Sequence, residues 1–98
     1  MIKHIVIWKF KNKQEREKNI FEFKKKLESM DGRVDVIKQI EVGINVNKKS
    51  PTAYDILLYT EFDSLDDLGA YQKDEYHEEI KDYISRLDVE SCVVDYEA

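Results

Sequence analysis

Cysteine, proline and glycine are all scarce in this chain of 98 residues, which contains one cysteine, one proline and three glycines. The single cysteine, Cys92, excludes a disulfide bond within the chain and is typical of a protein from a reducing cytoplasm. Its neighbours Val93 and Val94 favour a small packed side chain over a reactive thiol. The glycines form no phosphate-cradling loop, and no repeat or low-complexity segment is present.

Long hydrophobic runs are also missing, and no apolar segment is long enough to span a membrane. The N-terminal apolar run is short, contains His4 and Lys9, and lacks a cleavage site of small residues, so we expect no signal peptide. Together with the cysteine content, these features predict a cytoplasmic protein.

Basic residues are fewer than acidic ones. The chain has 16 Lys and Arg and 21 Asp and Glu, which gives a net charge of −5. Nucleic-acid binding requires a basic surface, so this balance argues against nucleic acid as the main partner. The lysine run at residues 24–26 more simply forms the solvated face of a helix. The length corresponds to one domain, residues 1–98, with a modest core that a partner subunit would enlarge.

The most apolar and β-branched segment is IKHIVIWKF at residues 2–10, which predicts a strand. Alternate side chains of a strand point to opposite faces. One face therefore carries Ile2, His4, Val6, Trp8 and Phe10. The other face has Ile5 and Ile7 at its centre. Because both faces are apolar, we expect both to be covered.

A helix is predicted at residues 14–30, with Asn12 and Glu15 as its capping pair and Gly32 just beyond its end. Its apolar stripe consists of Ile20, Phe23, Leu27 and Met30, widened by Phe21. Strands are predicted at residues 34–46 and 54–62, joined by a loop at residues 47–53 that contains the proline.

Ser64 is the expected N-cap of a short helix that turns Leu65, Leu68 and Tyr71 inward. Asp74 is the expected cap of a second helix at residues 75–87, and the last strand is predicted at residues 89–96. The resulting order is βαββαβ, with the second helical segment split in two. This order indicates a ferredoxin-like α+β fold with a four-stranded antiparallel sheet.

The helices of such a fold cover one face of the sheet only. The other face, with Ile5, Ile7, Leu57 and Tyr59, needs a cover that this chain has no further helices to supply. A second copy related by a two-fold axis supplies it. We therefore expect a homodimer with two sheets packed face to face, that is, a dimeric α/β barrel.

Two histidines, His4 and His77, are the only ones in the chain, and both lie on faces predicted to point inward. Histidine titrates near neutral pH, so a pair in a dry cavity can serve as acid and base. Tyr71, predicted nearby, can donate to a developing oxyanion. This set suits proton abstraction beside a carbonyl, or aldol-type ring closure, without a cofactor. The alternative, which spacing alone favours, is that these are hydrogen-bonded core residues.

The predicted lining of a substrate cavity comes from the same layer. It consists of Val6, Trp8, Ile20, Phe23 and Leu27, with Tyr59 and Leu68 as further candidates. The alternative is that these aromatic side chains fill the space as core and leave no pocket. No HxH, HExxH or CxxC spacing is present, so we expect no metal site.

The sequence resembles the stress-responsive dimeric α/β-barrel family over nearly its whole length. The resemblance rests on IKHIVIWKF, IEVGINV at residues 40–46, YDILLYTEFDSLDDLGAYQ at residues 54–72, His77 and the closing VVDYE. It implies a ferredoxin-like protomer that forms a face-to-face dimer. A plant polyketide cyclase of this family closes an aromatic ring with two histidines and a tyrosine that match His4, His77 and Tyr71.

One departure from the family pattern lies just before the second histidine. Where the family has H-P-x-H, this chain has Asp74 and Glu75 in place of the first histidine and the proline.

The candidate residues and the family resemblance leave three hypotheses for the function. The first is a cofactor-free, polyketide-cyclase-like enzyme acting on a small apolar carbonyl compound. The second is a non-catalytic, stress-related protein that holds a small apolar ligand. The third is haem binding or degradation, with His77 as axial ligand.

Overall fold

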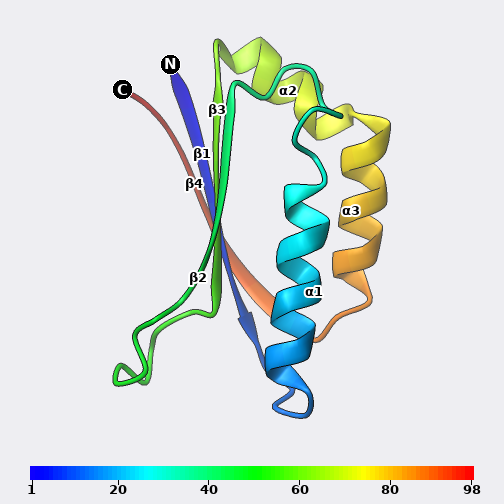
Figure 1. The fold of residues 1–98 in the computed structure, drawn as a ribbon. Helices are drawn as coiled ribbons and strands as arrows, with labels where there is room; N and C mark the ends of the chain where they lie inside the picture. Colours follow the sequence, from blue (N-terminus) through cyan, green and yellow to red (C-terminus); the bar gives the residue numbers. More distant parts are fainter.

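A four-stranded antiparallel sheet carries three helices on one face in the computed structural model, which describes residues 1–98 (Figure 1). The elements in chain order are β1 (Ile2–Phe10), α1 (Arg16–Glu28), β2 (Gln39–Ile44), β3 (Ile56–Phe62), α2 (Leu65–Lys73), α3 (Glu75–Ser85) and β4 (Val89–Glu97). The strand order is β2-β3-β1-β4. The ferredoxin-like fold is thus confirmed. None of the three helices has the length and apolar character needed to cross a membrane.

The core lies between the sheet and the helices, and Phe23 of α1 is at its centre. Its side chain is fully buried. Its ring centroid lies 4.9 Å from that of Trp8 and 5.4 Å from that of Phe10, both in edge-to-face contacts. The aromatic side chains of β1 and α1 therefore pack against one another in the core. Their edge-to-face geometry is one that aromatic pairs prefer over face-to-face stacking.

The start of α1 differs from the predicted one. The helix begins at Arg16 instead of residue 14, and Glu15 adopts a left-handed conformation with φ 52° and makes no side-chain cap. The Asn12 side chain accepts a hydrogen bond from the Gln14 amide at 2.9 Å, which makes a local turn. The predicted capping pair was therefore wrong. Phe21 was also wrongly assigned to the buried stripe, because 53% of its surface is exposed.

The second strand is shorter than predicted, because β2 spans only Gln39–Ile44. The preceding residues form turns after α1, in which the Val34 amide donates to the carbonyl of Met30 at 3.2 Å. Val34 is nonetheless buried. Its burial in a turn, not in a strand, produced the alternating pattern that predicted an earlier start. Gly32 lies in these turns and not at the helix end, and its φ of 80° is a left-handed conformation that glycine adopts without strain.

Both predicted caps of the split helical segment are confirmed. The Ser64 hydroxyl accepts from the Asp67 amide at 3.1 Å. The Asp74 carboxylate accepts from the amides of Tyr76 and His77 at 2.8 and 3.2 Å. Asp74 therefore fixes the corner between α2 and α3. Leu65, predicted to point inward, is 68% exposed instead, because it occupies the first turn of α2 at the edge of the molecule.

The face of the sheet opposite the helices is bare in the single chain (Figure 1). Ile5 pairs with Tyr59 and Ile7 with Leu57 across β1 and β3, so the four side chains form one continuous apolar patch. Leu57 is 37% exposed, although the residues that flank it in β3 are buried. We call these four residues the open-face patch.

Candidate active site

A cleft of about 430 Å³ lies on the helix side of the sheet, where β1, the end of α2 and α3 meet. His4 of β1, Tyr71 in the last turn of α2 and His77 in the first turn of α3 all line it. Val6, Trp8 and Leu27 form part of its apolar wall. The fold thus brings His4 of the first strand together with Tyr71 and His77, which are close to each other in the sequence but far from His4.

His4 is held by Asp95. The antiparallel register of β1 and β4 places the two residues directly opposite each other. Nδ1 of His4 and a carboxylate oxygen of Asp95 form a hydrogen bond. His4 is only 6% exposed. A carboxylate that accepts from Nδ1 fixes both the orientation and the tautomer of the imidazole, which leaves Nε2 for a ligand.

Tyr71 lies between the two histidines. Its ring centroid is 5.7 Å from that of His4, edge to face, and 4.0 Å from that of His77, stacked. Burial raises the pKa of Tyr71 well above its ordinary value, and the nearby Asp95 carboxylate raises it further. The Tyr71 hydroxyl therefore keeps its proton at neutral pH and is available as a hydrogen-bond donor.

His77 carries an unsatisfied ring nitrogen, because its buried Nδ1 makes no hydrogen bond within the chain. Burial lowers the pKa of His77, and the positive charge of Lys81 lowers it further. Weaker effects of Glu78 and of a hydrogen bond with the Gln72 backbone oppose this shift. The imidazole is therefore neutral at pH 7, when one of its ring nitrogens can accept a proton.

Two of the five residues predicted to line the cavity, and both further candidates, Tyr59 and Leu68, do not line this cleft. Phe23 is enclosed in the core, as described above. Ile20, one turn earlier in α1, faces a different pocket near the start of that helix. Val6, Trp8 and Leu27 do line the cleft, whereas Tyr59 belongs to the open-face patch. The error arose because an apolar helical stripe extends along the whole helix, whereas the cleft borders only its C-terminal part.

Asp95 was missed by the sequence reasoning. A carboxylate between the apolar residues of the last strand was the available signal. Its pairing with His4, however, depends on the register between strands 91 residues apart. For metal ions, no group of three or more His, Cys, Asp or Glu side chains has the required arrangement.

Comparison with known proteins gives a consistent match. The family model of the stress responsive A/B barrel domain matches residues 2–98. A dimeric ferredoxin-like protein of unknown function from Bacteroides fragilis is 32% identical, with a TM-score of 0.85 over 99% of this chain and 95% of that one. No curated protein sequence matches significantly.

Two further solved structures share the fold at lower identity. A protein from Arabidopsis thaliana is 23% identical, with a TM-score of 0.82 over 100% of this chain and 95% of that one. A hydroxynitrile lyase from Passiflora edulis is 15% identical, with a TM-score of 0.75 over 97% and 90% of the two chains. At these identities the likeness is one of fold.

Proposed function

The chain belongs to the stress-responsive A/B barrel domain family, and we propose that it is a cofactor-independent enzyme that moves a proton beside the carbonyl group of a small apolar substrate. The observation that carries this proposal is the grouping of His4, Tyr71 and His77 around one cleft, with Nδ1 of His77 buried and unpaired. An unpaired buried polar atom costs free energy, and such costs are typically retained where a side chain has a functional role.

Each side chain has a distinct role in the proposed reaction. His77, neutral at pH 7, accepts the proton from the carbon beside the carbonyl, and the electron pair of that C–H bond moves to form the enolate. Tyr71 donates its hydroxyl proton as a hydrogen bond to the enolate oxygen. His4, oriented by Asp95, acts as the acid partner that returns a proton. An enolate that attacks a second carbonyl of the same substrate gives the aldol-type ring closure of a polyketide-cyclase-like reaction.

The apolar wall of the cleft sets the substrate class. Val6, Trp8 and Leu27 offer no charged group to a ligand. A volume of about 430 Å³ falls in the range of small-molecule sites. We therefore assign a small, largely apolar carbonyl compound to the cleft.

Proton abstraction is testable without the physiological substrate. In D₂O, the enzyme should accelerate exchange of the protons beside the carbonyl of 4-phenyl-2-butanone, which is followed by proton NMR. His77→Gln and His4→Ala should abolish the acceleration while retaining the wild-type circular dichroism spectrum. Tyr54→Phe, a tyrosine outside the cleft, is the control and should exchange at the wild-type rate. Full activity in both histidine variants would refute the proposal.

Ligand retention without conversion is the second candidate function. The same apolar walls and the Tyr71 donor suffice to hold a ligand, since retention needs no proton transfer. Native mass spectrometry of freshly purified protein separates the two functions. An unaltered compound that stays bound and never turns over favours a binding protein, whereas recovery of a chemically altered compound favours the enzyme.

We also propose that the protein is a homodimer that buries the open-face patch. The patch is apolar and uncovered in the single chain. The similar protein from Bacteroides fragilis is described as dimeric. A closed two-fold dimer covers the same patch on both subunits at once.

A further inference from the structure

A second pocket, of about 500 Å³, lies at the opposite end of α1 from the cleft. It is bounded by the end of β1, the start of α1 and the connection between β2 and β3, which are neighbours at the lower end of Figure 1. None of its lining residues lines the cleft. The two pockets are therefore separate sites, and the one described here is independent of the proposed reaction.

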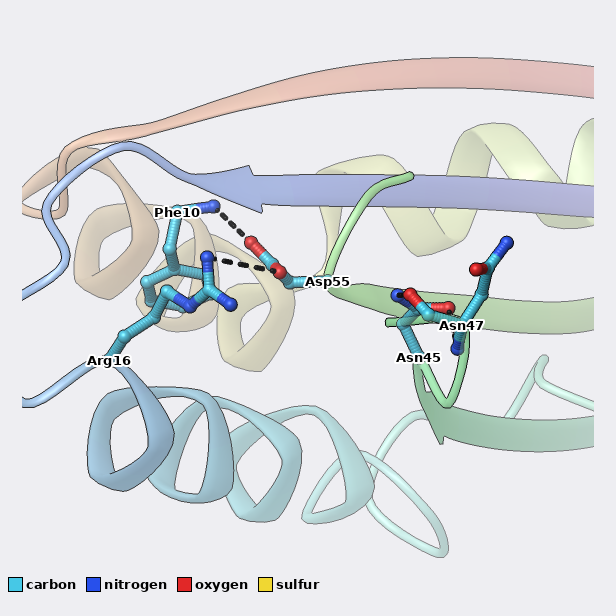
Figure 2. A network of polar contacts seen from close by, with 5 residues as sticks. All are labelled: Phe10, Arg16, Asn45, Asn47 and Asp55. Carbon is cyan, nitrogen blue, oxygen red and sulfur yellow. Dashed lines mark hydrogen bonds and ion pairs between the residues drawn. The ribbon is translucent and has the colours of Figure 1, made fainter. Parts of the chain in front are cut away.

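Asp55 and Arg16 both line this pocket, and Figure 2 shows their side chains pointing toward each other. The Asp55 carboxylate accepts a hydrogen bond from the Phe10 amide at 2.7 Å. Nη1 of Arg16 lies 3.8 Å from its other oxygen. The Asp55 side chain is 11% exposed and that of Arg16 is 39% exposed. The carboxylate thus has a hydrogen bond on one oxygen and a positive charge near the other, and it holds the guanidinium at the pocket wall.

Arg16 keeps most of its hydrogen-bonding capacity for a ligand. A guanidinium has five N–H donors. The single contact with Asp55 is an ion pair longer than a hydrogen bond, and Arg16 donates no side-chain hydrogen bond within the chain. A half-buried guanidinium with free donors is a favourable partner for a planar or tetrahedral oxyanion.

The charge around the pocket is opposite to that of the whole chain. Although the chain has a net charge of −5, its pocket lining includes five basic residues and two acidic ones, Glu17 and Asp55. The basic residues are Lys9, Lys11, Lys13, Arg16 and Lys48. None of the four lysines forms an ion pair within the chain. The pocket is therefore a local concentration of uncompensated positive charge.

The rest of the lining gives the pocket an ordered rim and an apolar wall. The Asn45 side chain donates to the Asn47 carbonyl at 2.8 Å and accepts from its amide at 2.9 Å, which holds the connection between β2 and β3 in place (Figure 2). Phe10 and Ile20 are buried, and Ile44 is 40% exposed. A ligand can therefore contact apolar side chains while its charge faces the basic ones.

We propose that this pocket binds a small organic phosphate monoester. The phosphate dianion lies against Arg16 and the lysines of the rim, where a guanidinium can bind two of its oxygens at once. The organic part packs on Ile20 and Ile44. A dianion matches the excess of positive charge better than a carboxylate does, because it pairs with more than one of the basic side chains.

Phenyl phosphate is the probe for this proposal, titrated into the whole protein at low salt and followed by amide NMR shifts. Saturable binding with shifts confined to the pocket lining is expected. Inorganic phosphate, which lacks the apolar part, should bind more weakly. Arg16→Gln should weaken phenyl phosphate binding about tenfold or more, the typical effect of losing a charged hydrogen bond. His77→Gln should leave the affinity unchanged.

The double variant Lys11→Gln/Lys13→Gln keeps the test decisive if loss of the Arg16–Asp55 pair unfolds the protein. It should also weaken binding, because it removes two of the rim cations. The matched control is Lys26→Gln/Lys73→Gln, two exposed lysines of α1 and α2 that lie outside the pocket. Equal weakening in the control, wild-type affinity in the rim variant, or no saturable binding of phenyl phosphate would overturn the proposal.

Discussion

At the scale of single residues, the hydrogen bond of Asp95 orients the His4 side chain. Asp95 touches His4 at Nδ1 and is a positioning residue. Asp95→Asn should lower kcat in the exchange assay by about two orders of magnitude or more, because the amide no longer fixes the imidazole tautomer. KM should change little. Glu90→Gln, on the exposed surface of the same strand, should behave as wild type, and a similar loss there would contradict the assignment.

Both the proposed activity and the stability should depend on pH through His77. Its pKa in the folded protein is lowered by burial, so a proton acceptor remains available below the ordinary histidine pKa of about 6.5. The exchange rate should therefore reach its plateau already below that pH. In the same range the unfolded chain binds a proton more readily than the folded one, so stability falls as pH decreases from about 6.5. In urea titrations, His77→Gln should flatten this decrease; an unchanged slope would exclude His77 as its cause.

At the scale of elements, the corner between α2 and α3 determines where His77 lies. Asp74 caps α3 with two hydrogen bonds to backbone amides, one of them that of His77 itself. Asp74→Ala should lower the free energy of unfolding by about 1 kcal/mol, as measured by urea denaturation. It should also reduce exchange activity, since the first turn of α3 loosens. Asp35→Ala, at an exposed turn, is the control and should change stability by no more than a few tenths of a kcal/mol.

Prediction of the elements succeeded where local signals agree. The apolar run of β1 and the caps Ser64 and Asp74 depend on neighbouring residues alone, and all three were predicted. The start of α1 was misplaced because the side chain of Asn12 forms a turn with Gln14 instead of capping the helix. A local turn and a helix cap at Asn12 have the same sequence signature, so the sequence does not distinguish them.

At the scale of the whole molecule, the open-face patch should decide the association state. Ile7→Glu places a charge in the centre of the patch and, in a two-fold dimer, brings two carboxylates together. Sedimentation equilibrium should show a dimer for the wild type and a monomer for this variant. Phe21→Glu changes an exposed aromatic on the outer side of α1 and should remain dimeric. A monomeric wild type would contradict the proposed cover of the sheet.

Sequence patterns predicted the element order, the two-faced character of β1 and the inward placement of His4. These properties follow from side-chain periodicity, which is a local property of the chain. Which residues contact one another depends on tertiary packing. Strand register pairs Asp95 with His4, helix packing separates Ile20 and Phe23 from the cleft, and three chain segments converge to gather the basic pocket around Arg16. These relations join residues far apart in sequence, and periodicity carries no information about register or about the packing of one element on another.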